Sequence, residues 1–272
     1  MTRTMAVIAV LVLVLGTCAA QDLETSASGR AQVGGPGMAE AWLQNPAFLG
    51  LYSADGAAGS GWRHSAAGMF ECSGDVELRT ISWSGYPAGS SWGVGAGWTD
   101  VLRMSEIGLG FGTKLGKGLA CGLNYQRIDV DIAGVGDSDV FDLGIAGTLN
   151  TGDQTGKATW GIVARDVTDE VQTTYDIGMA LDYGRWTLAF DLEDITDEND
   201  MVFQIGGRTS FGKRGEWTVA AGFDDGDPTA GLIYNARPSR GAGSWKLGVV
   251  WHEGDEGASD SWLIGASTVW GG

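Results

Sequence analysis

Long parts of the chain alternate between apolar residues and small or polar ones. From Tyr175 to Tyr183 every odd-numbered residue is apolar, whereas the residues between them are Asp, Gly or Ala. After Gly184 the alternation resumes from Trp186 to Leu192, with the apolar residues now at even positions. A period of two places successive side chains on opposite faces of a β-strand. The sequence therefore predicts two strands joined by a tight turn, each with one apolar face.

The same pattern marks fourteen strand candidates after residue 58. We expect strands at 61–70, 74–86, 90–99, 105–114, 118–130, 139–149, 156–166, 173–183, 185–195, 201–211, 215–224, 228–236, 243–252 and 259–270. Most are close to the length of about 9–11 residues that a tilted strand needs to cross a membrane. Within the second candidate the alternation slips between Leu78 and Ile81, which predicts a β-bulge.

Aromatic rings often stand at both ends of an apolar strand face. These residues are Trp92, Trp98, Tyr175, Tyr183, Trp186, Trp217, Phe223, Trp245, Trp251, Trp262 and Trp270. Two aromatic girdles with aliphatic side chains between them are typical of a transmembrane β-barrel, and an even strand number suits a bacterial one. We therefore predict an all-β fold, a transmembrane antiparallel barrel of about 14 strands in contact with outer-membrane lipid.

The charge of each connection depends on whether the strand before it has an even or an odd number. Connections after even-numbered strands gather the basic residues Lys114, Lys117, Lys157, Arg185, Lys213, Arg214, Arg237 and Arg240. Connections after odd-numbered strands are acidic, as in 193–200 and 224–227. If the N-terminus is periplasmic, the acidic connections face outside. A secreted β-sandwich also alternates, but it would bury most of its aromatic residues in one core.

The N-terminus has the features of a signal peptide. Arg3 precedes an apolar run that is too short to span a bilayer as a helix, and Cys18-Ala19-Ala20 forms a small-residue cleavage site. We assign 1–20 to the signal peptide, and lipidation of Cys18 remains an alternative. Of the other cysteines, Cys72 and Cys121 are either paired or free.

The second face of the strands is lined by small residues. The chain holds 46 glycines in 272 residues, many of them at inward positions such as Gly93, Gly95 and Gly97. Fourteen strands enclose more space than such side chains fill. We expect the segment 21–58 to be a plug or hatch inside a barrel formed by 59–272.

One motif in this segment carries a resemblance to a known family. An Ala-rich stretch leads into Asn45-Pro46-Ala47-Phe48, and the Asn-Pro step is a turn signal. The motif, its distance from the signal peptide and the strand count resemble the FadL/TodX-type outer-membrane transport proteins and their PorV/PorQ-like branch. The resemblance implies a plugged barrel in the outer membrane of a Gram-negative-type bacterium, with these four residues at the plug turn or ligand site.

Other chemistry is weakly represented. The net charge of −17 argues against nucleic-acid binding. Gly89-Ser90-Ser91-Trp92-Gly93 fits a nucleophile pattern, but it stands at a hairpin turn rather than a strand-to-helix elbow. A triad would need His64 or His252, and His252 also fits a rim position beside Trp251. We expect no enzyme activity and no cofactor.

Charged groups leave two further alternatives open. The acidic connections lack EF-hand spacing, so we expect solvated loops and no metal site. Four arginines fall on or near strands, either facing lumen acids or lying at the rims. They are Arg79, Arg127, Arg165 and Arg208.

Three functions compete on this basis. The first is passive transport of hydrophobic or small amphipathic molecules, through movement of the hatch or a lateral gap at a strand kink. The second, implied by PorV-like barrels, is binding of secreted or surface-attached protein partners. The third is a secreted soluble β adhesin.

Overall fold

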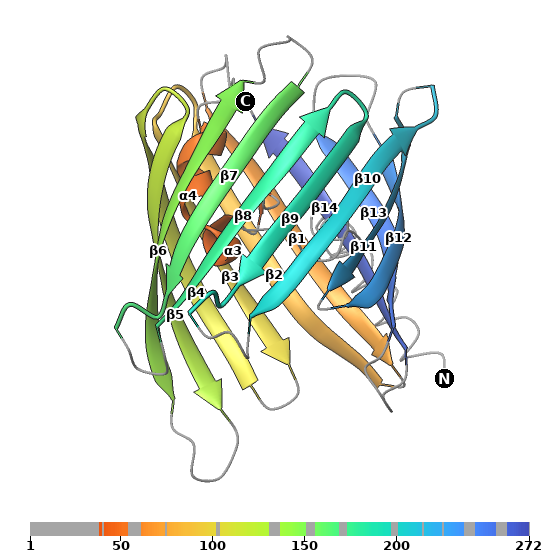
Figure 1. Cartoon of the computed structure of the whole chain (residues 1–272), viewed down its shortest axis with the longest axis horizontal. Coiled ribbons are helices and arrows are strands. Elements are labelled where there is room, and N and C mark those ends of the chain that lie inside the picture. Colours follow the sequence, from red (N-terminus) through yellow and green to blue (C-terminus); the bar gives the residue numbers. More distant parts are fainter. Residues whose placement is uncertain are drawn as a thin grey trace.

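The structure, a computed structural model, describes residues 38–39, 41–53, 61–73, 75–101, 104–130, 137–150, 156–168, 173–196, 201–213, 215–224, 226–236, 243–253 and 260–271. Fourteen antiparallel strands form a closed barrel, in which each strand pairs with its neighbours along the chain and the last pairs with the first (Figure 1). The predicted fourteen-stranded barrel is therefore confirmed. Closure leaves no unpaired sheet edge.

The strand boundaries follow the alternation closely. The strands are β1 (Trp62–Ser73), β2 (Asp75–Pro87), β3 (Trp92–Val101), β4 (Met104–Gly116), β5 (Leu119–Val130), β6 (Ser138–Asn150), β7 (Gly156–Arg165), β8 (Thr174–Tyr183), β9 (Trp186–Glu193), β10 (Val202–Phe211), β11 (Trp217–Asp224), β12 (Asp227–Ala236), β13 (Ser244–His252) and β14 (Ser261–Gly271). The largest difference is at β1, which extends to Ser73 rather than residue 70.

The predicted bulge in β2 is also confirmed. Met69 pairs with Thr80 and Phe70 pairs with Leu78, so that Arg79 is an extra residue in β2. An extra residue reverses the face on which the following side chains lie, which explains the slip in the alternation.

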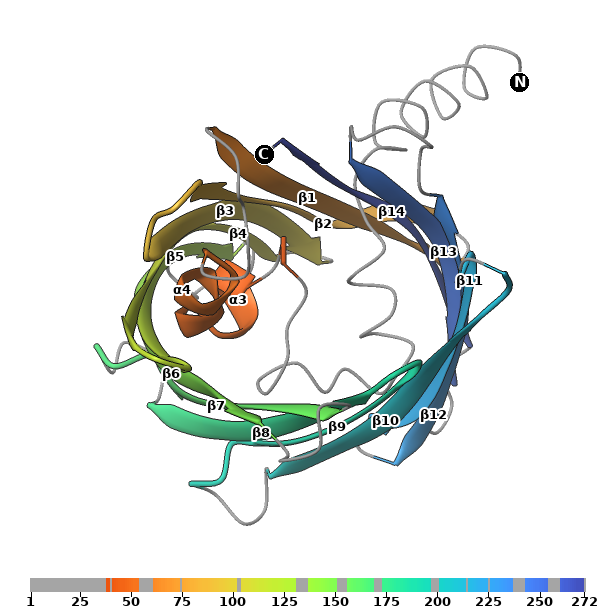
Figure 2. The ribbon, with the colours of Figure 1, turned by 90° about the horizontal axis from the view of Figure 1, so that it is seen from above.

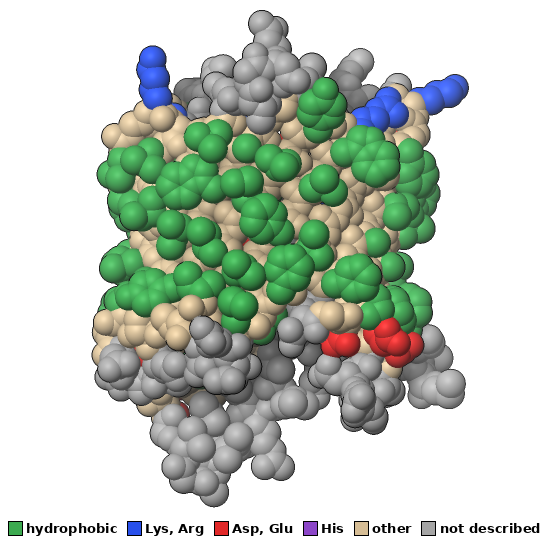
Figure 3. Space-filling view, in the orientation of Figure 1, with side chains coloured by type: hydrophobic (Ala, Val, Ile, Leu, Met, Phe, Trp, Pro, Cys, Tyr) green, Lys and Arg blue, Asp and Glu red, His purple; other side chains and the backbone are tan. Residues whose placement is uncertain are grey.

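The outer wall of the barrel is apolar. Hydrophobic side chains cover the strands between a rim with lysine and arginine and an opposite rim with acidic residues (Figure 3). Large apolar residues such as Leu109 and Leu188 are 59% and 58% exposed. An apolar surface of this extent is unfavourable in water and suits a hydrocarbon environment.

Two short helices lie inside the barrel. They are α3 (Ala41–Gln44) and α4 (Ala47–Ser53), and together with Asn45 and Pro46 they are called the inner helices below. Viewed along the barrel, they lie on one side of the interior against β3, β4, β5 and β6 (Figure 2). Among the described residues, no helix has the length and apolar character needed to cross a membrane.

Candidate functional site in the barrel interior

The predicted turn residues join the two inner helices. The backbone N–H of Asn45 donates to the carbonyl of Ala41 and closes α3. The Asn45 side-chain oxygen then accepts a hydrogen bond of 3.1 Å from the N–H of Ala47. Asparagine is a favoured helix N-cap and proline is favoured at the first helical position. Asn45-Pro46 therefore ends one helix and begins the next, and this second helix is not predicted by the sequence pattern.

This turn rests on a row of wall glycines. Gly93, Gly112, Gly122 and Gly144 are direct cross-strand neighbours on four successive strands. A Cβ added at Gly112 or Gly122 would clash with backbone atoms of Pro46. Only the absence of side chains lets the inner helices approach the wall this closely.

The side chains of the inner helices form a dense core with the wall. Trp42, Ala47 and Leu49 are completely buried, and Phe48 is 1% exposed. Fully burying a large apolar side chain contributes roughly 1.5–3 kcal/mol. The inner helices are therefore packed against the wall as part of a hydrophobic core.

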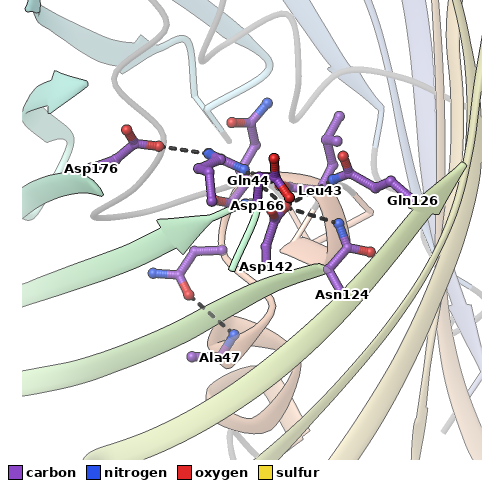
Figure 4. Close-up of polar contacts among 10 residues, drawn as sticks. Leu43, Gln44, Ala47, Asn124, Gln126, Asp142, Asp166 and Asp176 are labelled. Atoms are coloured by element: carbon purple, nitrogen blue, oxygen red, sulfur yellow. Dashed lines mark hydrogen bonds and ion pairs between the residues drawn. The ribbon is translucent and has the colours of Figure 1, made fainter. Parts of the chain in front are cut away.

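A partly buried arginine connects the wall to the end of α3. Arg165 donates from Nη1 to the carbonyl of Leu43 at 2.8 Å and from Nη2 to the carbonyl of Gln44 at 3.0 Å. Its Nε donates to Asp176 at 2.7 Å (Figure 4). The carbonyls at a helix end have no partner within the helix, and a cation there is favourable. Arg165 thus faces the interior, one of the two alternatives left open by the sequence.

Asp142, which is 1% exposed, forms a second ion pair with Arg165. Its Oδ2 lies 3.6 Å from Arg165 and accepts hydrogen bonds from Gln126 at 3.0 Å and Asn124 at 3.4 Å (Figure 4). Its Oδ1 accepts from the N–H of Asp166. Each oxygen of this buried carboxylate has a partner, so the charge is compensated and Arg165 is held toward α3.

The chain before α3 is tied to the wall by a second contact. The Met38 carbonyl accepts hydrogen bonds from Ser84 Oγ at 2.6 Å and Tyr86 Oη at 2.8 Å, both on β2. The chain is thus bound to the wall before α3, at Met38, and at the end of α3, at Leu43 and Gln44.

The opposite part of the inner wall carries a small apolar cluster between single glycines, such as Gly231 opposite Val250 and Gly248 opposite Ile233. Its buried side chains come from β11, β12, β13, β14 and β1 and form a separate cluster. They are Ala220, Ile233, Val250, Leu263 and the partly buried Met69. An apolar surface inside a barrel is suited to contact with apolar groups rather than ions.

The predicted aromatic girdle residues lie near the ends of their strands. At the rim where β1 begins are Trp92, Tyr183, Trp186, Trp217, Trp245 and Trp270. At the opposite rim are Trp98, Tyr175, Phe223, Trp251 and Trp262. Near the first rim, His64 stacks against Trp62, Trp83 and Trp270 at ring distances of 6.0, 5.8 and 5.2 Å. Since β1 pairs with β14, this aromatic cluster crosses the seam that closes the barrel.

The other candidates lie apart from the inner helices. Arg127 is exposed and forms ion pairs with Asp129 and Asp137. Ser90 lies in the β2–β3 turn with its hydroxyl 2.8 Å from the carbonyls of Pro87 and Trp92. His252 is the last residue of β13, at the rim beside Trp251, and it is 8% exposed. In an antiparallel barrel, the end of β13 is at the opposite rim from the β2–β3 turn, so Ser90 and His252 are far apart.

Two further expectations concern cysteines and metals. Cys121 is a free cysteine, and the side chain of Cys72 lies outside the described residues. The described part of the chain contains no cluster of acidic, histidine or cysteine side chains that could hold a metal ion.

Comparisons with known proteins identify similar folds. No protein-family model and no curated protein matches this sequence. The Pseudomonas putida toluene transporter TodX has a similar structure, with a TM-score of 0.55 and 10% identity over 94% of this chain and 99% of that chain. The Ralstonia pickettii toluene transporter TbuX gives a TM-score of 0.53 and 9% identity over 94% of this chain and 98% of that chain. These similarities establish the barrel fold.

Proposed function

We propose that this protein is an outer-membrane barrel for passive transport of hydrophobic or small amphipathic molecules, and that the inner helices are its plug. The observation that carries the proposal is the placement of the inner helices, packed on glycines and bonded to Arg165 inside a closed barrel. The apolar outer wall and the aromatic residues at both rims support a membrane location.

The apolar cluster around Ile233 and Val250 supports the substrate class. It lies on strands other than those that contact the inner helices. These side chains are buried, so they contact a solute only after the interior rearranges; an apolar solute then gains apolar contacts, whereas an ion would lose its hydration without replacement. The similar structures TodX and TbuX, which are described as toluene transporters, support the same substrate class.

Three experiments test this proposal. The protein should fractionate with the outer membrane and migrate differently on gels with and without boiling. In vesicles whose outer leaflet is lipopolysaccharide, it should accelerate entry of the apolar probe phenylnaphthylamine but not of glucose. Removal of residues 22–53 should leave the gel shift intact and increase ion conductance in planar bilayers. Absence of probe entry, with unchanged conductance after the deletion, would contradict the transport function and favour partner binding.

A further inference from the structure

Four inward glycines form a flat surface beneath Trp42. Gly95 pairs with Gly110 and Gly97 pairs with Gly108 across β3 and β4. A Cβ added at Gly95 or Gly110 would lie 2.6 Å from Trp42 Cβ, and one at Gly97 or Gly108 would clash with the six-membered ring of the indole. The wall here consists of bare backbone that is complementary to a planar ring.

Two polar atoms beside this surface have no hydrogen-bond partner among the described residues. They are Trp42 Nε1 and Ser82 Oγ, on side chains that are completely buried. Ser82 is the cross-strand neighbour of Gly97 and therefore shares its inner face. A buried unsatisfied polar group costs about 1–3 kcal/mol. Packing alone does not require a hydroxyl at position 82, because alanine would fill the same place without that cost.

We propose that Gly95, Gly97, Gly108, Gly110 and Ser82 form a binding site for a planar aromatic ring with one small polar substituent, such as phenol or indole. Trp42 occupies the site while the inner helices are in place. The inference rests on the proposed transport function, because an aromatic solute reaches the site only when the plug withdraws and the Trp42 ring leaves. The solute and the indole then compete for one surface.

The shape of the surface sets its selectivity. A flat ring contacts the backbone of both strands across its whole face. The dispersion attraction of these contacts falls steeply with the distance between the atoms. A cyclohexane ring of similar size is puckered, so that its axial hydrogens hold the carbons away from the glycines. The Ser82 hydroxyl gives a polar substituent a partner that a plain hydrocarbon does not use.

The test uses the full chain in detergent with Trp42 replaced by alanine. An apolar cavity made by removing a large side chain stays dry and binds small aromatic molecules. Calorimetric titration should show phenol and indole binding to Trp42→Ala at least about tenfold more tightly than to the wild type, with cyclohexanol at least about tenfold weaker than phenol. Adding Gly108→Val should abolish binding. Adding Ser82→Ala should weaken phenol but not toluene.

A second variant keeps the test valid if Trp42→Ala does not fold. Trp42→Leu keeps an apolar side chain but removes the ring, and it should give the same preference for phenol over cyclohexanol. Equal affinities for phenol and cyclohexanol, or binding that survives Gly108→Val, would overturn the site. Ring binding without probe entry into vesicles would contradict the transport function alone. Probe entry without ring selectivity would contradict the site alone.

Discussion

Arg165 should control how often the inner helices leave the wall. It donates to the carbonyls of Leu43 and Gln44 while it is paired with Asp176 and Asp142. Replacement by methionine removes both donors and preserves much of the side-chain volume. We expect Arg165→Met to raise the fraction of time that the barrel spends in a conducting state.

The two bonds to α3 set the size of this effect. A hydrogen bond to a charged group contributes roughly 1.5–3 kcal/mol, so two give about 3 kcal/mol at the lower end of the range. The lower end applies because water can satisfy the carbonyls and the guanidinium after the helices leave. At 1.4 kcal/mol per factor of ten, opening should increase about 100-fold. Loss of the buried ion pairs affects closed and open barrels alike and lowers overall stability, by roughly 3–5 kcal/mol.

Planar-bilayer recording of single channels provides the assay. Arg165→Lys should give an intermediate increase, because one ammonium group does not reproduce the forked geometry of the guanidinium. Arg127→Met is the matched control, since Arg127 pairs with Asp129 and Asp137 at the rim and should leave opening unchanged. An unchanged open fraction in a correctly folded Arg165→Met, or an equal rise in Arg127→Met, would refute the reasoning.

Three other outcomes are expected. Leu188→Arg should impair assembly, measured by the gel shift, far more than Thr187→Arg, because arginine costs roughly 2–4 kcal/mol on a lipid-facing wall; equal effects would mean that the faces are misassigned. An epitope tag inserted at 194–200 should be labelled on intact cells. If a tag at 212–215 is labelled instead, the barrel has the opposite orientation in the membrane. Trp270→Ala should lower the temperature at which the gel shift is lost more than Leu188→Ala does, since Trp270 stacks on His64 across the closing seam; an equal drop would show that the aromatic cluster does not stabilise closure.

The barrel was predictable because its signal is local. A strand exposed to different environments on its two faces must alternate, and Tyr175 to Tyr183 shows this within nine residues. Even the bulge at Arg79 was visible, because an extra residue interrupts the alternation at that point. Pairing then follows from short connections, which place consecutive strands side by side.

The interior was less predictable because its contacts are distant in sequence. Asn45 and Pro46 signalled a turn, but nothing near them indicated that Arg165 donates to the preceding helix end. An arginine near a strand end is equally compatible with a rim position, as Arg127 shows. The choice between these positions depends on Asp142 and Asp176, whose approach is set only by closure of the barrel.

The distribution of inward glycines does contain a signal for the inner helices. Glycine within a strand is less stable than alanine by roughly 0.5–1 kcal/mol, so a run of inward glycines is unfavourable for the barrel alone. Runs of three occur on β3 and β4, whereas β12 and β13 each have a single inward glycine, Gly231 and Gly248, beside Ile233 and Val250. The asymmetry is explained if packing of Trp42 and Pro46 on the glycine side offsets the loss of strand stability. Uneven glycine content around a barrel therefore indicates which part of its wall receives an internal segment.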